Sequence, residues 1–200
     1  MQNTLPRLFL VRHGETEWSL SGQHSGHADI PLTLNGESEA RRLGDRIRDV
    51  SFQYVLTSPL QRARQTCQFA GFADHGEVEP DLIEWDNGDY QGRTRKEIEA
   101  SRPGWDLFRD GCPNGESPQQ ILDRADRLIA KLVKLHGSVA LFTHGHFGRV
   151  LGARWIGMSI ELADRLLLDT ASLSILGYQH NQASDRAIAL WNSPSRGRFE

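Results

Sequence analysis

Two short apolar runs, far apart in the chain, each end in a histidine followed by a glycine. Residues 8–11 lead into Arg12-His13-Gly14, and residues 139–142 lead into Thr143-His144-Gly145. A continuous apolar run of this length is typical of a strand buried on both faces of a parallel sheet. If these two strands lie side by side, both histidines reach one pocket at the sheet edge, where open α/β sheets hold ligands.

The residues after the first run suit an anionic ligand. Arg12 offers a planar fork that matches phosphate oxygens, and His13 is a nitrogen nucleophile near neutral pH. Gly14 allows a backbone or a ligand to approach closely. The alternative interpretation is a solvated arginine and a surface histidine after an ordinary strand.

Length and composition narrow the possible classes of protein. The chain has 200 residues, 38% of them apolar, and a formal charge of −3, which fits a single domain spanning 1–200 with a core over about 8–191. The balanced charge argues against a nucleic-acid surface or a polybasic membrane contact. No apolar run reaches the length of a membrane span and no signal peptide is visible, so we expect a cytoplasmic protein. Cys67 and Cys112 are expected to be reduced packing residues.

The remaining segments alternate between helical and extended patterns. Residues 22–32 predict a loop that forms a pocket wall, and Arg62 falls in the opening turn of a predicted helix, where an anion is favoured. The clearest helix begins at Ser117, with Pro118 at its first position and Gln120 completing a capping box. The other predicted helices cover 33–50, 60–72, 94–102 and 147–157, and the other predicted strands cover 54–57, 77–81, 172–178 and 187–191. Residues 105–116 are predicted to be an irregular cover that carries Arg109, and the residues from Ser193 a loose tail.

These elements predict a three-layer α/β domain. The sheet is expected to be mostly parallel, with helices on both faces and the pocket at the carboxyl ends of the strands.

Five motifs, in order along the chain, resemble the histidine phosphatase superfamily, in its phosphoglycerate mutase-like branch. They are Leu10-Val11-Arg12-His13-Gly14-Glu15-Thr16, Pro31-Leu32-Thr33, Thr57-Ser58-Pro59-Leu60-Gln61-Arg62-Ala63, Leu82-Ile83-Glu84 with Gly88-Asp89-Tyr90-Gln91-Gly92, and Thr143-His144-Gly145. Further stretches are similar to the sedoheptulose-1,7-bisphosphatase type within that branch. Those stretches are Glu17-Trp18-Ser19, Ser21-Gly22-Gln23, Ser25-Gly26, Glu84-Trp85 with Gly88-Asp89-Tyr90, Arg109-Asp110-Gly111-Cys112, Asn114-Gly115-Glu116 and His144-Gly145-His146.

The resemblance implies a phosphatase that works in two steps. His13 would attack phosphorus to form a phosphohistidine, which water then hydrolyses. Arg12, Arg62 and His144 would surround the phosphoryl oxygens, and positive neighbours would keep His13 unprotonated. Glu84 would protonate the leaving alkoxide and then activate water. By position, the resemblance also assigns phosphate contacts to Ser25, Gly26 and Gly145.

Several assignments keep an alternative at this point. Asp81, Asp86 and Asp89 lie near Glu84 and compete with it for the acid role, although the Leu82-Ile83-Glu84 spacing favours Glu84. His146 fits either a substrate contact or packing on the sheet, and His24 is the best substrate candidate among the other histidines. Many relatives have asparagine where Ser19 stands, so a direct phosphoryl contact from the shorter serine is in doubt.

Net hydrolysis is favoured over a mutase reaction because the interval between Glu84 and His144 is short. The expected substrate is a small phosphorylated metabolite, most simply a sugar bisphosphate. Candidates for holding its second phosphate are Arg93, Arg95, Lys96, Arg109 and Arg149. No cofactor or metal is expected, because the cationic side chains supply the charge that a metal would bring. The open alternatives are a phosphoglycerate mutase, a broad-specificity phosphomonoesterase, a metal site at His144-Gly145-His146 and a non-catalytic phosphate-binding module. A homo-oligomer is compatible with the sequence.

Overall fold

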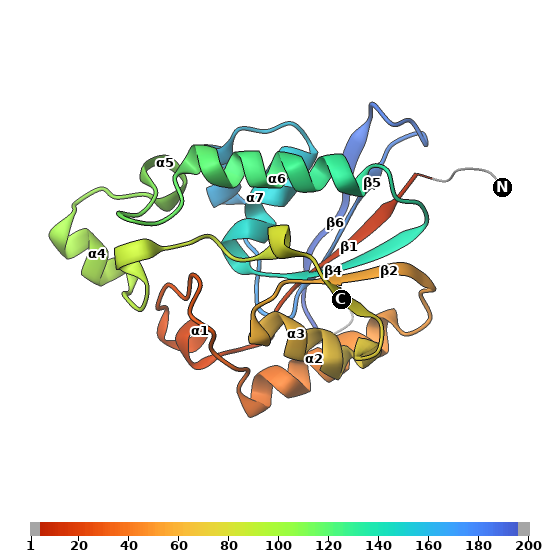
Figure 1. The fold of residues 1–200 in the computed structure, drawn as a ribbon, viewed down its shortest axis with the longest axis horizontal. Helices are drawn as coiled ribbons and strands as arrows, with labels where there is room; N and C mark the ends of the chain where they lie inside the picture. The colour runs from red at the N-terminus through yellow and green to blue at the C-terminus, as the bar shows by residue number, and fades with distance from the viewer. Residues whose placement is uncertain (1–4, 196–200) are drawn as a thin grey trace.

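A six-stranded sheet forms the middle layer of the computed structural model, which describes residues 5–195 (Figure 1). The strand order is β3-β2-β4-β1-β5-β6. The first four strands in that order are mutually parallel, β5 runs antiparallel to β1, and β6 runs antiparallel to β5. The strands are β1 (Arg7–Arg12), β2 (Phe52–Thr57), β3 (Gly76–Val78), β4 (Ser138–Thr143), β5 (Leu173–Tyr178) and β6 (Arg186–Ser193).

Helices cover both faces of this sheet, which confirms the predicted α/β architecture. In Figure 1, α6 (Pro118–Leu132) and α7 (Gly145–Trp155) lie on one side, and α2 (Leu34–Ile47) and α3 (Gln61–Cys67) lie on the other. The shorter helices α1 (Glu17–Ser21), α4 (Arg95–Ser101) and α5 (Leu107–Asp110) gather beyond one end of the sheet. Short 3-10 helices cover Pro80–Leu82, Gly88–Tyr90 and Ile160–Arg165.

The side chains of β1 point alternately to the two faces of the sheet, and the core has one half on each face. Leu8 and Leu10 belong to a cluster with the apolar side chains of α6 and α7, whereas Phe9 and Val11 belong to one with α2. Successive side chains of a strand point to opposite faces, so a strand that is covered on both sides must be apolar throughout. The continuous apolar runs of the sequence therefore mark the buried central strands.

Helix signals in the sequence place most boundaries correctly. Ser117 caps α6, and its side chain and that of Gln120 form the predicted capping box. The predicted helix over 60–72 is only partly correct, because α3 ends at Cys67 and a π turn follows in which Gly71 has a φ of 95°. Pro59 lies before this helix, whose N-cap is Leu60.

Two predictions at the edges of the fold are wrong. The segment 105–116 is not wholly irregular, because Asp106 caps the short helix α5. Ser193 does not begin a loose tail, because it is buried at the end of β6 and its Oγ accepts a hydrogen bond from Arg46 Nη2 at 2.8 Å. Residues 196–200 of the predicted tail lie outside the described residues.

Within residues 5–195, no helix is both long enough and apolar enough to cross a membrane.

Candidate active site

The parallel pairing of β1 and β4 determines where the two histidines meet. Arg12 is in register with Thr143, and the amide of His13 donates to the carbonyl of Thr143 at 2.9 Å. His13 and His144 therefore follow at the same sheet edge, with ring centroids 5.3 Å apart. The pairing expected from the two apolar runs is confirmed.

His13 is buried, with 3% of its surface exposed, and its hydrogen bonding defines its tautomer. Its Nδ1 lies 2.7 Å from the carbonyl oxygen of Gly14, which can only accept, so Nδ1 carries the proton. Burial, and then the charges of Arg62 and Arg12, hold the pKa of His13 well below its usual value. The ring is neutral at physiological pH, and Nε2 keeps a free lone pair.

Arg62 comes from the first turn of α3 and is fully buried. Its Nε donates to Nδ1 of His144 at 3.1 Å, while its Nη1 and Nη2 donate to the carbonyls of Ala28 and Gly26 at 2.6 and 2.9 Å. Burial lowers the pKa of Arg62 to about 10, so the guanidinium is still charged at neutral pH. Arg62 thus brings a positive charge to His13 and ties the loop over 22–32 to the sheet.

His144 is also fully buried, and both of its ring nitrogens have partners. Nδ1 accepts from Arg62, so Nε2 carries the proton and donates to Ser58 Oγ at 2.6 Å. Burial, followed by the charge of Arg62, keeps the pKa of His144 well below its usual value. The second histidine is therefore a neutral side chain next to His13.

Arg12 brings a positive charge to the border of the open pocket. Its Nη1 donates to the carbonyl of Leu168 at 2.5 Å, and its Nε has no hydrogen-bond partner among the described residues. Gly145 makes room for this guanidinium, since a Cβ at Gly145 would lie 3.3 Å from the Cζ of Arg12. A small residue after His144 therefore has a packing reason.

Glu84 reaches the same pocket from the segment after Pro80–Leu82, and its carboxylate caps the N-terminus of α7. Oε1 accepts from the amide of Phe147 at 2.8 Å, and Oε2 accepts from the amide of His146 at 3.1 Å. Burial raises the pKa of Glu84, but His146, the backbone amides of Trp85 and Phe147, and Arg62 outweigh it and lower the pKa overall. Glu84 is thus a carboxylate in the unliganded protein.

A pocket of about 200 Å³ opens above these groups. It is lined by Arg12, His13, Trp18, Ser19, Gly22, Gln23, His24, Ser25, Glu84, Gly145, His146, Arg149 and Leu168. The expected residues Ser19, His24, Ser25 and His146 do share this cavity. Ser19 Oγ, however, is occupied within α1, where it accepts from the amide of Thr16 at 2.9 Å.

His24 and His146 stack against each other on one wall, with ring centroids 5.4 Å apart and planes within 13° of parallel. Burial lowers the pKa of both rings, that of His146 to about 3, so the wall presents neutral imidazoles. Nδ1 of His24 is buried without a hydrogen-bond partner among the described residues. His146 therefore both borders the pocket and packs on its neighbours.

Other predicted contacts lie elsewhere. Arg109 is outside the pocket, on the exposed side of α5, where its Nη2 binds Asp110 Oδ2 at 2.8 Å and the carbonyl of Gly104 at 2.6 Å. Of the five candidates for a second phosphate, Arg149 alone lines the cavity. Gly26 contributes its carbonyl to Arg62 rather than lining the pocket.

Sequence reasoning missed three residues of the pocket wall and its support. Trp18 and Leu168 line the cavity, and Ser58 binds His144. Ser58 stood in a quoted motif, so that position carried a signal, whereas nothing near Leu168 points to its contact with Arg12.

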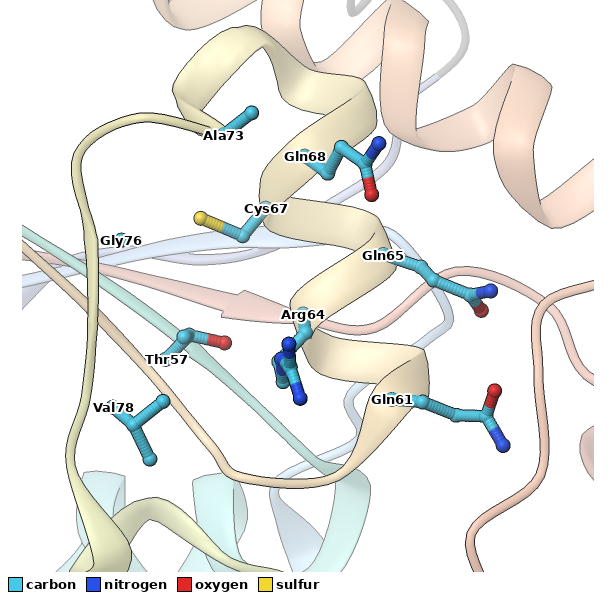
Figure 2. A pocket seen from close by; sticks show the side chains of 9 residues that line it. All are labelled: Thr57, Gln61, Arg64, Gln65, Cys67, Gln68, Ala73, Gly76 and Val78. Carbon is cyan, nitrogen blue, oxygen red and sulfur yellow. The ribbon is translucent and has the colours of Figure 1, made fainter.

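A larger cavity of about 380 Å³ lies on another face, between α3 and β3 (Figure 2). Gln61, Gln65 and Arg64 project from α3, and the described lining includes no histidine and no carboxylate. Burial raises the pKa of the Cys67 thiol there to about 12, which makes it a poor nucleophile. The smaller pocket is the one with groups able to catalyse a reaction.

Among residues 5–195, no three histidine, cysteine, aspartate or glutamate side chains are grouped so that they could hold a metal ion.

The family model of the histidine phosphatase superfamily (branch 1) matches residues 8–193. The chain belongs to this superfamily. As its motifs predicted, it is a phosphoric monoester hydrolase.

Two relatives and one solved structure illustrate this kinship. The chain is 36% identical over 192 residues to an acid phosphatase of Mycobacterium tuberculosis, covering 94% of each chain. It is 32% identical to the sedoheptulose 1,7-bisphosphatase of Saccharomyces cerevisiae, covering 95% of this chain and 94% of the relative. The solved structure of an open reading frame from Mycobacterium tuberculosis superposes with a TM-score of 0.89 at 34% identity, covering 95% of this chain and 98% of that chain.

Proposed function

We propose that the protein hydrolyses phosphate monoesters through a phosphohistidine on His13, without a metal ion. The observation that carries this proposal is the state of His13: a neutral ring whose Nδ1 is held by Gly14, so that Nε2 keeps its lone pair beside two arginines. In the first step, an Nε2–phosphorus bond forms while the bond from phosphorus to the ester oxygen breaks. The leaving alkoxide takes a proton from Glu84.

In the second step, water replaces the histidine. Glu84, now a carboxylate, accepts a proton from the attacking water while the Nε2–phosphorus bond breaks and inorganic phosphate leaves. The positive charges of Arg12 and Arg62, together with the backbone amide of Gly145 at the start of α7, stabilise the charge on the phosphoryl oxygens. His144 holds Arg62 in place and lies against the nucleophile.

The lowered pKa of Glu84 needs an explanation, because an acid must carry a proton when the substrate reacts. A bound phosphate ester brings negative charge close to the carboxylate, and negative charge raises the pKa of a neighbouring acid. Substrate binding would therefore place the proton on Glu84 when it is needed.

The pocket supports a polyhydroxylated substrate, and we assign a sugar bisphosphate such as sedoheptulose 1,7-bisphosphate as its class. The neutral rings of His24 and His146 can exchange hydrogen bonds with sugar hydroxyls. Arg149 is held at the cavity wall by Asp164, with Nη2 at 2.9 Å from Oδ1, and would hold the second phosphate. The named activity of the yeast relative agrees with this class.

The test is phosphate release, with a chelator present, from sugar bisphosphates, sugar monophosphates, 3-phosphoglycerate and a phosphohistidine peptide. Wild type is compared with His13→Ala. Rapid release from one bisphosphate that is lost in the variant supports the proposal, and isomerisation of 3-phosphoglycerate would favour a mutase. Phosphate release that does not depend on His13, or none at all, would refute the mechanism and favour a binding module.

A further inference from the structure

Arg124 lies on α6, outside the pocket, yet the residue is only 6% exposed and its side chain faces the segment that carries Glu84. Its Nη1 donates to the carbonyls of Asp81 and Ile83 at 3.0 and 2.7 Å, and its Nη2 donates to the carbonyl of Glu84 at 3.2 Å. Three backbone carbonyls within four consecutive residues thus depend on one guanidinium.

The two remaining hydrogens of this guanidinium bind Glu116. Nε donates to Oε1 at 2.8 Å and Nη2 donates to Oε2 at 2.6 Å, so all five N–H groups of Arg124 have acceptors. Glu116 is itself attached to the catalytic segment, because its carboxylate accepts from the amide of Asp86 and its carbonyl accepts from Trp85 Nε1. The pair therefore binds both ends of residues 81–86.

Arg124 also touches the other support of the Glu84 carboxylate. Its Cζ lies 4.3 Å from the ring centroid of Phe147, whose amide donates to Glu84 Oε1 at 2.8 Å. One side chain therefore contacts the backbone of Glu84 and the residue that orients its carboxylate. Lysine keeps the charge at this position but cannot supply five donors in a plane.

We infer that Arg124, paired with Glu116, is a positioning residue that aims Glu84 at the leaving oxygen and at the attacking water. This inference rests on the proposed role of Glu84 as the acid and base. It makes Arg124 a contributor to proton transfer although it never touches the substrate. A purely structural role would lower activity on all substrates alike, whereas a positioning role lowers it most for substrates whose leaving group needs a proton. The inference is therefore testable.

The experiment compares two substrates that differ in their need for an acid. Nitrophenolate leaves without a proton, whereas the alkoxide of glycerol 3-phosphate requires one. The kinetic constant kcat/KM is measured for wild type, Arg124→Lys, Glu116→Gln and Glu84→Gln. The matched control is Arg127→Lys on the same helix, whose exposed guanidinium binds the side chain of Asp81 at 2.7 Å rather than the backbone.

We expect Arg124→Lys to reduce kcat/KM for glycerol 3-phosphate by about 10- to 100-fold and that for nitrophenyl phosphate by less than about 3-fold. Glu116→Gln should show the same pattern more weakly, and Arg127→Lys should match wild type. Rapid mixing with nitrophenyl phosphate should also give a burst of nitrophenolate in Arg124→Lys, because the second step needs Glu84 as a base. Should Arg124→Lys fail to fold, Glu116→Gln tests the same pattern.

Equal losses on both substrates in Arg124→Lys and Glu116→Gln, while Glu84→Gln discriminates between the substrates, would overturn the positioning role alone. If Glu84→Gln also reduces both substrates equally, the acid role in the proposed function is wrong, and the inference about Arg124 is refuted with it.

Discussion

Arg62 donates a hydrogen bond from Nε to Nδ1 of His144 across 3.1 Å, and neither side chain has any exposed surface. A guanidinium can only donate, so His144 must carry its proton on Nε2, where Ser58 Oγ accepts it. While Arg62 is in place, His144 cannot readily become a cation. The positive charge around the nucleophile comes from the arginines.

Replacing Arg62 with lysine tests this relationship. A lysine cannot reach His144, Gly26 and Ala28 together, so buried carbonyls lose partners at a cost of about 1–3 kcal/mol. We expect kcat to fall by roughly 100-fold or more and the midpoint of thermal unfolding to fall by several degrees. The control is Arg64→Lys on the same helix, at the cavity of Figure 2, which should behave as wild type. Wild-type kcat in Arg62→Lys would contradict the assignment.

The pH dependence of kcat/KM should report on His13. Burial and the charges of Arg62 and Arg12 lower the pKa of His13, so its ring stays neutral well below pH 6.5. We therefore expect the acid limb of the pH profile, where kcat/KM falls as His13 is protonated, to lie well below pH 6.5. Removing a cation makes protonation of the ring easier. Arg12→Gln should therefore raise the pKa of His13 and move the acid limb to higher pH, apart from its effect on rate. A limb that stays in place or moves to lower pH would show that Arg12 does not act on His13 by charge.

Two glycines should respond very differently to substitution by alanine. A Cβ at Gly36 would lie 2.2 Å from the backbone oxygen of Glu15, in the segment just after His13, whereas a Cβ at Gly177 meets nothing within 4 Å. We expect Gly36→Ala to lower the free energy of unfolding by about 2 kcal/mol or more and Gly177→Ala to change it by less than about 0.5 kcal/mol. Urea denaturation measures both, and similar values would refute the close approach at Gly36.

Both thiols should resist alkylation in the folded protein. Burial raises the pKa of Cys67 to about 12 and that of Cys112 to about 11, so very little thiolate exists at pH 8. Mass spectrometry after iodoacetamide treatment should find no adduct in native protein and two in urea. Rapid native labelling of either thiol would contradict the raised pKa described for it.

The catalytic edge of the sheet could be predicted from the sequence because local patterns encode it. The apolar runs before His13 and His144 mark central strands, and parallel central strands must deliver their carboxyl ends to the same edge. Helix caps such as Ser117 are equally local. Residues within a few positions of each other specify these features, so the features can be recognised in the sequence alone.

Contacts between distant segments were not predictable in this way. The hydrogen bonds from Arg124 to the segment of Glu84, and from Arg12 to Leu168, join residues 40 and 156 positions apart. The position of Arg109 outside the pocket was not predictable either, because the sequence gives the charge of a basic residue but not the direction of its side chain. Neighbouring Asp110 holds that guanidinium on the surface.

The loop over 22–32 is attached to α3 at several points: Arg62 holds Gly26 and Ala28, the amide of Gln61 binds Asp29 Oδ1, and Gln65 Oε1 accepts from Leu32. A loop that is held by several hydrogen bonds along its length has no hinge, and it is in place before any ligand binds. Association should therefore cost little ordering entropy, and product should depart without a gating motion. We therefore expect that opening of this loop does not limit turnover.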